Sequence, residues 1–215
     1  MSKGYYERRR FRSGDFEYLL DDDDRTAWID KGCSGGARVY SLPETALVEG
    51  IVYKVTGVEV HGFNTQGDCQ IEELFIPDNC EYIDELSFRQ APVKTLHIGK
   101  GLRNYHPWSF RSACPDWLVE IHPDNPCLKT SADGHMILSR DGKELVALIH
   151  DIEDMTVPEG VEVIRSLAVS CKKQLRSLHL PSTLKRIERY GIMENENLEG
   201  PIIPEECVII REQEQ

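Results

Sequence analysis

Cysteine and histidine are the side chains of this sequence that could supply nucleophilic or metal-binding chemistry, and there are seven of each among 215 residues. A cysteine nucleophile needs a neighbouring histidine and an orienting third group, and common zinc sites use a Cys-x-x-Cys pair. No two cysteines have that spacing, and no G-x-S-x-G, phosphate-loop or dinucleotide-binding motif occurs. The sequence therefore predicts no enzyme, metal site or cofactor, and it favours reduced thiols.

Four consecutive aspartates at 21–24 are a second candidate for metal chemistry. A calcium loop needs ligands at alternating positions, a glycine and a distal glutamate, and this run lacks that spacing. Apolar segments flank the run at 16–20 and 26–29. We interpret it as the solvated tip of an N-terminal capping hairpin, with a calcium loop as the sharper alternative.

Charge narrows the class of partner. The chain has 25 Lys and Arg against 37 Asp and Glu, a formal net charge of −12, which repels nucleic acid and anionic membranes. The one basic cluster lies near the start, and we interpret residues 1–15 as a solvated basic tail. No apolar stretch suits a signal peptide or a membrane span. We expect no nucleic-acid partner, no membrane insertion and a cytoplasmic location; the alternative is a secreted or cell-surface protein whose leader has been removed.

The elements that position these residues follow a repeat. Pro158, Pro181 and Pro204 are 23 residues apart, and an isoleucine lies six residues after each of them. Pro77 begins an equivalent unit, and Gly99 takes the proline position of the next. A fixed period is the signature of a solenoid, in which stacked units share a continuous core.

Apolar and polar residues alternate before each proline position, as a strand with one buried face requires. We predict parallel strands, stacked in sequence order, at 74–76, 96–98, 119–121, 155–157 and 178–180. Apolar columns three and six residues after the proline position are expected to be buried, and they include Cys80, Cys207, Ile164 and Ile187. The residues two after it suit a turn of positive φ: Asn79, Gly101 and Gly160.

Two irregular segments interrupt the period. Apolar residues at 136–138 and 145–148 flank a turn with an Asp-Gly pair, which is a strong hairpin signal. We therefore predict a hairpin insertion within about 124–150. The first unit, from Tyr40 to Phe63, is longer than the others, as terminal capping repeats often are.

These units resemble the BspA-like leucine-rich repeats of bacterial surface proteins, with the pattern L-x-x-I-x-I-P-x-x-V-x-x-I-x-x-x-A-F-x-x-C-x-x-L. Residues 175–187 follow it closely, and Ser87-Phe88 and Ser109-Phe110 occupy the A-F place. The resemblance implies an α/β repeat fold: a curved leucine-rich-repeat solenoid with stacked parallel short strands, an inserted β-hairpin and an N-terminal capping hairpin. We expect a single solenoid domain over 16–210 and a polar C-terminal tail over 211–215.

The outward side of the predicted strands, here called the strand face, is the candidate binding surface. Two columns of side chains cross it: Phe75, His97, Glu120, Thr156 and His179 in one, and Glu73, Thr95, Asp154 and Ser177 in the other. At about 4.8 Å per rung, His97 and His179 are too far apart to share a zinc ion. Mixed polar groups around an exposed phenylalanine suit a protein or peptide ligand.

Function is expected to follow from that surface, since family members are mostly implied to be adhesins or protein-binding scaffolds. We expect a non-enzymatic protein-binding scaffold. The alternatives are a structural or self-associating module without a specific ligand and, more remotely, an enzyme. Two prolines, Pro201 and Pro204, lie around the last predicted strand. Proline hinders the pairing of an edge strand with another chain, so these residues favour a monomer.

Overall fold

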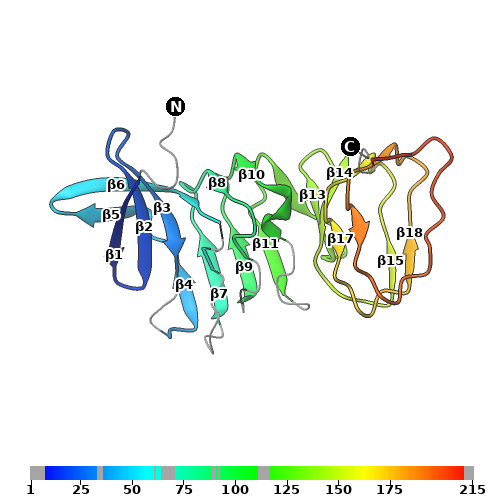
Figure 1. Cartoon of the computed structure of the whole chain (residues 1–215), viewed down its shortest axis with the longest axis horizontal. Helices are drawn as coiled ribbons and strands as arrows, with labels where there is room; N and C mark the ends of the chain where they lie inside the picture. Colours follow the sequence, from blue (N-terminus) through cyan, green and yellow to red (C-terminus); the bar gives the residue numbers. More distant parts are fainter. Residues whose placement is uncertain are drawn as a thin grey trace, which may run out of the picture.

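The strands of the chain are stacked in sequence order along one long axis (Figure 1). The structure, a computed structural model, describes residues 8–32, 36–60, 62–63, 71–88, 91, 93–110 and 117–210. Successive units contribute one strand to a first sheet and one strand to a second. The result is a β-solenoid. No helix in the described ranges is long and apolar enough to cross a membrane.

The strand face forms in two pieces. The first is a parallel sheet of β4 (Val39–Ser41), β7 (Ile71–Ile76), β9 (Val93–Ile98) and β11 (Leu118–Ile121). The second is the parallel pair β15 (Asp154–Thr156) and β18 (Ser177–His179). Parallel pairing and sequence order are confirmed within each piece. No ladder joins β11 to β15 in the described part of the chain, and the predicted insertion lies between these two strands in the sequence.

The returning half of each unit forms a strand, which has two residues in every unit after the first. β6 (Ile51–Val58), β8 (Tyr82–Ile83) and β10 (Asn104–Tyr105) are parallel neighbours, as are β16 (Val163–Ile164), β19 (Arg186–Ile187) and β21 (Val208–Ile209). β17 (Val169–Ser170) pairs with β20 (Ile192–Met193). The described residues contain one 3-10 helix, η2 (Pro107–Phe110), and no α-helix. The expected α/β class is not confirmed, because short strands and turns, and not helices, place the apolar columns inside the coil.

The insertion lies where the strand face breaks. β12 (Leu128–Thr130), β13 (Met136–Ser139) and β14 (Glu144–Leu148) are antiparallel in that order, and β14 then pairs in parallel with β16. Its side chains divide between two clusters of buried residues. Ile137 and Val146 belong to the first cluster, here called the N-terminal core, which begins at Tyr18. Met136 and Leu145 belong to the second cluster, here called the C-terminal core, which ends at Ile187.

The hairpin therefore separates two cores, and the expected continuous core is wrong. Both of its faces are buried, which explains why its strands are uninterrupted apolar runs and not alternating ones. Asp141 fixes the turn, since its Oδ1 accepts the Lys143 amide at 3.0 Å and Gly142 adopts a φ of 81°.

The N-terminal cap is a sheet and not a lone hairpin. β2 (Phe16–Asp21) and β3 (Thr26–Lys31) flank the aspartate tip, β1 (Arg9–Ser13) pairs antiparallel with β2, and β3 pairs in parallel with β6. β5 (Thr45–Val48) adds a further antiparallel edge to β6.

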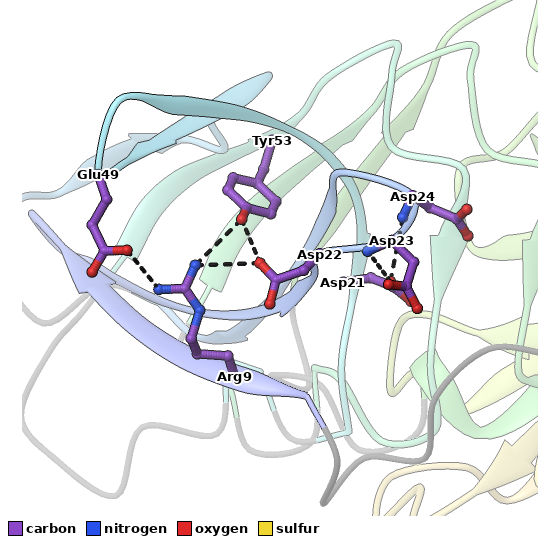
Figure 2. A network of polar contacts seen from close by, with 7 residues as sticks. All are labelled: Arg9, Asp21, Asp22, Asp23, Asp24, Glu49 and Tyr53. Carbon is purple, nitrogen blue, oxygen red and sulfur yellow. Dashed lines mark hydrogen bonds and ion pairs between the residues drawn. The ribbon is translucent and has the colours of Figure 1, made fainter.

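Residues 9–13 were expected in a basic tail, and that expectation is wrong. Phe11 packs partly buried against the N-terminal core, and Arg9 reaches Asp22, Glu49 and the Tyr53 hydroxyl (Figure 2). The backbone ladder with β2 makes this segment a strand, and Arg10 also lies 3.5 Å from the Asp30 carboxylate of β3. Residues 1–7 and the expected polar tail at 211–215 lie outside the described residues.

The apolar columns are buried except at Tyr105, which is partly buried, and at the last unit. Cys80, Ile164 and Ile187 are buried, whereas Cys207 is only partly buried and Ile210 is 44% exposed. No further unit stacks on that end in the described part of the chain, so those side chains stay in contact with solvent. The predicted burial of Cys207 is therefore wrong.

The residues two after the proline position, Asn79, Gly101 and Gly160, were expected to adopt positive φ, and most of them do not. Of the three residues only Gly160 has a positive φ, 95°. Asn79 instead donates its side-chain amide to the carbonyl oxygens of Glu44 and Val55. At Gly101 an added Cβ would lie 1.6 Å from the Asp78 carbonyl oxygen, so close packing between units explains that glycine.

Alkylation of the native protein should distinguish Cys80 from Cys207. Burial raises the pKa of the Cys80 thiol to about 12, so very little of it is thiolate near neutral pH. We expect peptide mapping after iodoacetamide treatment to find Cys207 labelled and Cys80 unlabelled until denaturant is added. Rapid labelling of Cys80 in the native protein would contradict its burial.

Candidate protein-binding face

The first piece of the strand face brings five of the candidate residues together. The register places Glu73 beside Thr95, and it aligns Phe75, His97 and Glu120 across β7, β9 and β11. In a parallel sheet such residues are neighbours about 4.8 Å apart. Glu73, Phe75, His97 and Glu120 are called the central cluster below.

His97 is the centre of this cluster. Its ring stacks on the Phe75 ring with centroids 4.0 Å apart and planes at 1°. Its Nε2 lies 3.0 Å from Glu73 Oε2, and its Nδ1 lies 3.0 Å from Glu120 Oε2. A neutral imidazole can donate to one of these carboxylates, and the protonated ring can donate to both. Each ring nitrogen thus has a fixed acceptor.

The contacts hold the cluster in place while leaving part of it accessible. The side chain of His97 is 22% exposed, and those of Glu73 and Glu120 are 44% and 58% exposed. Phe75 is half-buried. The expectation of a freely exposed phenylalanine is wrong, because one face of its ring is covered by His97.

A shallow hollow of about 310 Å³ runs beside the cluster. Phe75, His97 and Glu120 line it, together with His122 and Pro123 from the turn after β11. The outward columns of the sequence do not include the last two. Their position directly after a predicted strand end could have indicated them, since such turns border the strand face.

The other candidates lie in the second piece. Asp154 pairs with Ser177 and Thr156 with His179 across β15 and β18. His179 Nε2 is 3.1 Å from Asp154 Oδ1 and 3.1 Å from Ser177 Oγ. His179 and Asp154 are more exposed than the central cluster, at 61% and 67%. The hairpin insertion keeps them apart from the first piece.

A larger hollow of about 590 Å³ lies next to this second piece, toward the C-terminal end. His179, Glu199, Pro201 and Ile202 are among its lining residues. Ile202 is 90% exposed. The sequence pattern assigns this end no binding role.

Metal chemistry has no support on either piece. Among the described residues, no group of three or more His, Cys, Asp or Glu side chains is arranged to hold a metal ion. The geometry instead offers aromatic and carboxylate surface for contact with another molecule.

Similar structures share this fold. A leucine-rich cell surface protein of Faecalibacterium prausnitzii is 20% identical with a TM-score of 0.52, and the match covers 94% of this chain and 50% of that one. A leucine-rich repeat protein of Bacteroides ovatus is 18% identical with a TM-score of 0.55, and the match covers 94% of this chain and 55% of that one. The T. pallidum leucine-rich repeat protein is 19% identical with a TM-score of 0.52, and the match covers 90% of this chain and 83% of that one.

The chain thus spans about half the length of the F. prausnitzii protein. No curated protein matches it. The model of the BspA type leucine rich repeat region matches residues 60–125 and 146–214, with 6 copies. That match covers more than half of the sequence and includes the units on both sides of the hairpin. The chain belongs to the BspA type leucine-rich repeat family.

Proposed function

We propose that this protein is a non-enzymatic binding scaffold that contacts a protein or peptide through the first piece of its strand face. The observation that carries the proposal is the central cluster, where an aromatic pair is held between two carboxylates beside a shallow hollow. Solenoid repeat proteins generally use their extended surfaces for binding.

Two physical arguments support this choice. Side chains already fixed by neighbours lose little conformational freedom when a ligand binds, which improves affinity. Partly exposed aromatic rings near the centre of a contact surface are also typical energetic hot spots. The carboxylates favour a ligand segment that carries positive charge or hydrogen-bond donors.

Similarity to a described cell surface protein favours the extracellular alternative over a cytoplasmic location. In that setting the ligand would be a protein outside the cell, and the scaffold would act in the manner of an adhesin. Catalysis has no place in this proposal, because the cluster contains no activated nucleophile.

A self-associating module is the second candidate, favoured by the apolar C-terminal end. Ile202, Val208 and Ile209 are 90%, 62% and 38% exposed. Exposed apolar side chains at the end of a solenoid can pair with another molecule. It weakens the sequence argument for a monomer.

Affinity capture with a doubly substituted bait tests the proposal. Phe75→Ala with His97→Ala removes the stacked pair, and we expect it to reduce partner recovery at least about tenfold. The matched control is Glu162→Ala with Lys185→Ala, which removes the ion pairs of Glu162 with Lys185 at 2.8 Å and with Lys143 at 3.1 Å beside the second sheet and should leave recovery unchanged. Recovery is measured by quantitative mass spectrometry.

Both baits should remain folded, since the stacked pair is only partly buried and its loss should cost about 1–2 kcal/mol. Equal recovery by both folded baits would contradict the proposal. A wild-type bait that recovers only its own copies would favour the self-associating module.

A further inference from the structure

Two exposed apolar side chains lie on the first piece of the strand face, outside the outward columns derived from the repeat. Val39 of β4 is 53% exposed, and Leu118 of β11 is 41% exposed. Each comes directly before a buried residue of its own strand, Tyr40 in β4 and Val119 in β11. Because side chains alternate along a strand, Val39 and Leu118 both point outward.

The two residues are the ends of one row across the sheet. The row runs from Val39 through Glu73 and Thr95 to Leu118. It crosses β4, β7, β9 and β11, which lie side by side in Figure 1. Three steps of about 4.8 Å between neighbouring strands place the two ends of the row about 14 Å apart.

The neighbouring row carries most of the central cluster. It runs from Ser41 through Phe75 and His97 to Glu120. Together the two rows hold two carboxylates, Glu73 and Glu120, and one imidazole, and neither row contains a lysine or an arginine. The charge on a ligand that complements these rows is therefore positive.

Two basic side chains lie near the start of the strands. Arg38 precedes β4 and pairs with Glu72 at 2.8 Å, and Lys94 is the second residue of β9. Neither side chain belongs to a row, so the carboxylates are the fixed charges along both rows.

The spacing of the two apolar ends matches an extended peptide. Such a chain rises about 3.4 Å per residue, so its residues i and i+4 are about 14 Å apart. These residues and i+2 also point to the same side. A spacing of three would span only about 10 Å and turn the second side chain away from the sheet. Single exposed apolar residues are common on protein surfaces, but Val39 and Leu118 fit two anchors of one segment.

We propose that the ligand of the strand face is an extended peptide segment that crosses the strands. Its apolar residues i and i+4 contact Val39 and Leu118, and a lysine or arginine at i+2 lies beside Glu73. The stacked rings of Phe75 and His97 border the segment. The proposal rests on the proposed function, because it takes the first piece of the strand face as the binding surface.

Fluorescence polarisation with labelled synthetic peptides tests this arrangement. The matching probe is Ser-Leu-Thr-Lys-Thr-Leu-Ser. One comparator, Ser-Leu-Thr-Lys-Leu-Thr-Ser, changes only the leucine spacing, and the other replaces the lysine of the matching probe by glutamate. We expect saturable binding of the matching probe with a Kd of about 1 mM or below. Each comparator should bind at least about fivefold more weakly.

Substitutions locate the anchors. Val39→Ser with Leu118→Ser should weaken binding of the matching probe at least about fivefold. The matched control is Val52→Ser with Leu47→Ser, which changes a cross-strand pair that is 56% and 66% exposed on β5 and β6. The control should leave the affinity unchanged. All four side chains are exposed, so both variants should remain folded, and circular dichroism melts verify this.

Three results would overturn the proposal. They are no saturable binding of the matching probe, equal affinity for either comparator, and unchanged affinity in the folded Val39→Ser, Leu118→Ser protein. Binding that is lost with Phe75→Ala and His97→Ala but unchanged by the Val39 and Leu118 substitutions would refute these anchors and leave the proposed function standing. The affinity capture described above decides the proposed function separately.

Discussion

Ile164→Asp should unfold the C-terminal half of the solenoid under conditions in which the wild-type protein remains folded. Ile164 is fully buried in the C-terminal core, and its strand β16 pairs with both β14 and β19. An ionised carboxylate there would have no partner, and the loss of packing adds to its cost. We expect more than about 5 kcal/mol of destabilisation, against a total stability of about 5–15 kcal/mol for an ordinary domain.

Circular dichroism melts combined with hydrogen exchange measure this effect. Exchange should rise first between β13 and β20, because those strands enclose the C-terminal core. Lys185→Asp is the control: Lys185 is 70% exposed and pairs with Glu162, so its replacement should cost about 1 kcal/mol or less. Equally mild effects of the two substitutions would refute the assignment of the buried column.

Gly101→Ala should be the most damaging small substitution in the N-terminal half. The added Cβ would lie 1.6 Å from the Asp78 carbonyl oxygen and 2.5 Å from its carbon. Both atoms are backbone, so one unit has to move away from the next. We expect about 3 kcal/mol or more of destabilisation, which lowers the melting temperature by about 6–12 °C in a protein of this size.

Gly200→Ala is the matched comparison for that substitution. No atom lies within 4 Å of a Cβ added at Gly200, and we expect a change within about 0.5 kcal/mol. Denaturant titration of both variants measures the difference. A Gly101→Ala protein as stable as Gly200→Ala would show that adjacent units are not packed as closely as the structure has them.

The repeat pattern was sufficient to predict the rungs of the solenoid. Burial of one strand face forces strict alternation, and units of equal length place equivalent residues in register. The pairing of Phe75 with His97 and of Thr156 with His179 therefore follows from spacing alone. The buried positions of Cys80, Ile164 and Ile187 follow in the same way.

Features that depend on contacts between different units were not predictable in this way. The hairpin has both faces buried and so separates two cores, but an apolar run does not reveal what covers each side. Arg9 lies in a strand because β1 pairs with β2, and its contacts with Asp22 and Glu49 join residues that the sequence does not place together. Cys207 fits the column pattern but lacks a unit stacked above it in the described part of the chain.

The candidate site shows the same division. Its residues could be identified from the outward columns, because each column is defined by position in the repeat. The stacking of His97 on Phe75 and its contacts with two carboxylates depend on side-chain rotamers, which spacing does not specify. His122 and Pro123 lie in a turn outside the alternating pattern, so the columns could not include them.

Site-specific photo-crosslinking tests most directly whether the first piece of the strand face is the ligand surface. A benzoylphenylalanine replacing Thr95, which neighbours His97 on β9, reports contacts at the central cluster. The same residue replacing the exposed Lys185 reports contacts on the second sheet. We expect irradiation with native partners to give a partner adduct from position 95 and none from position 185. An adduct from position 185 alone, or from neither position, would contradict the account.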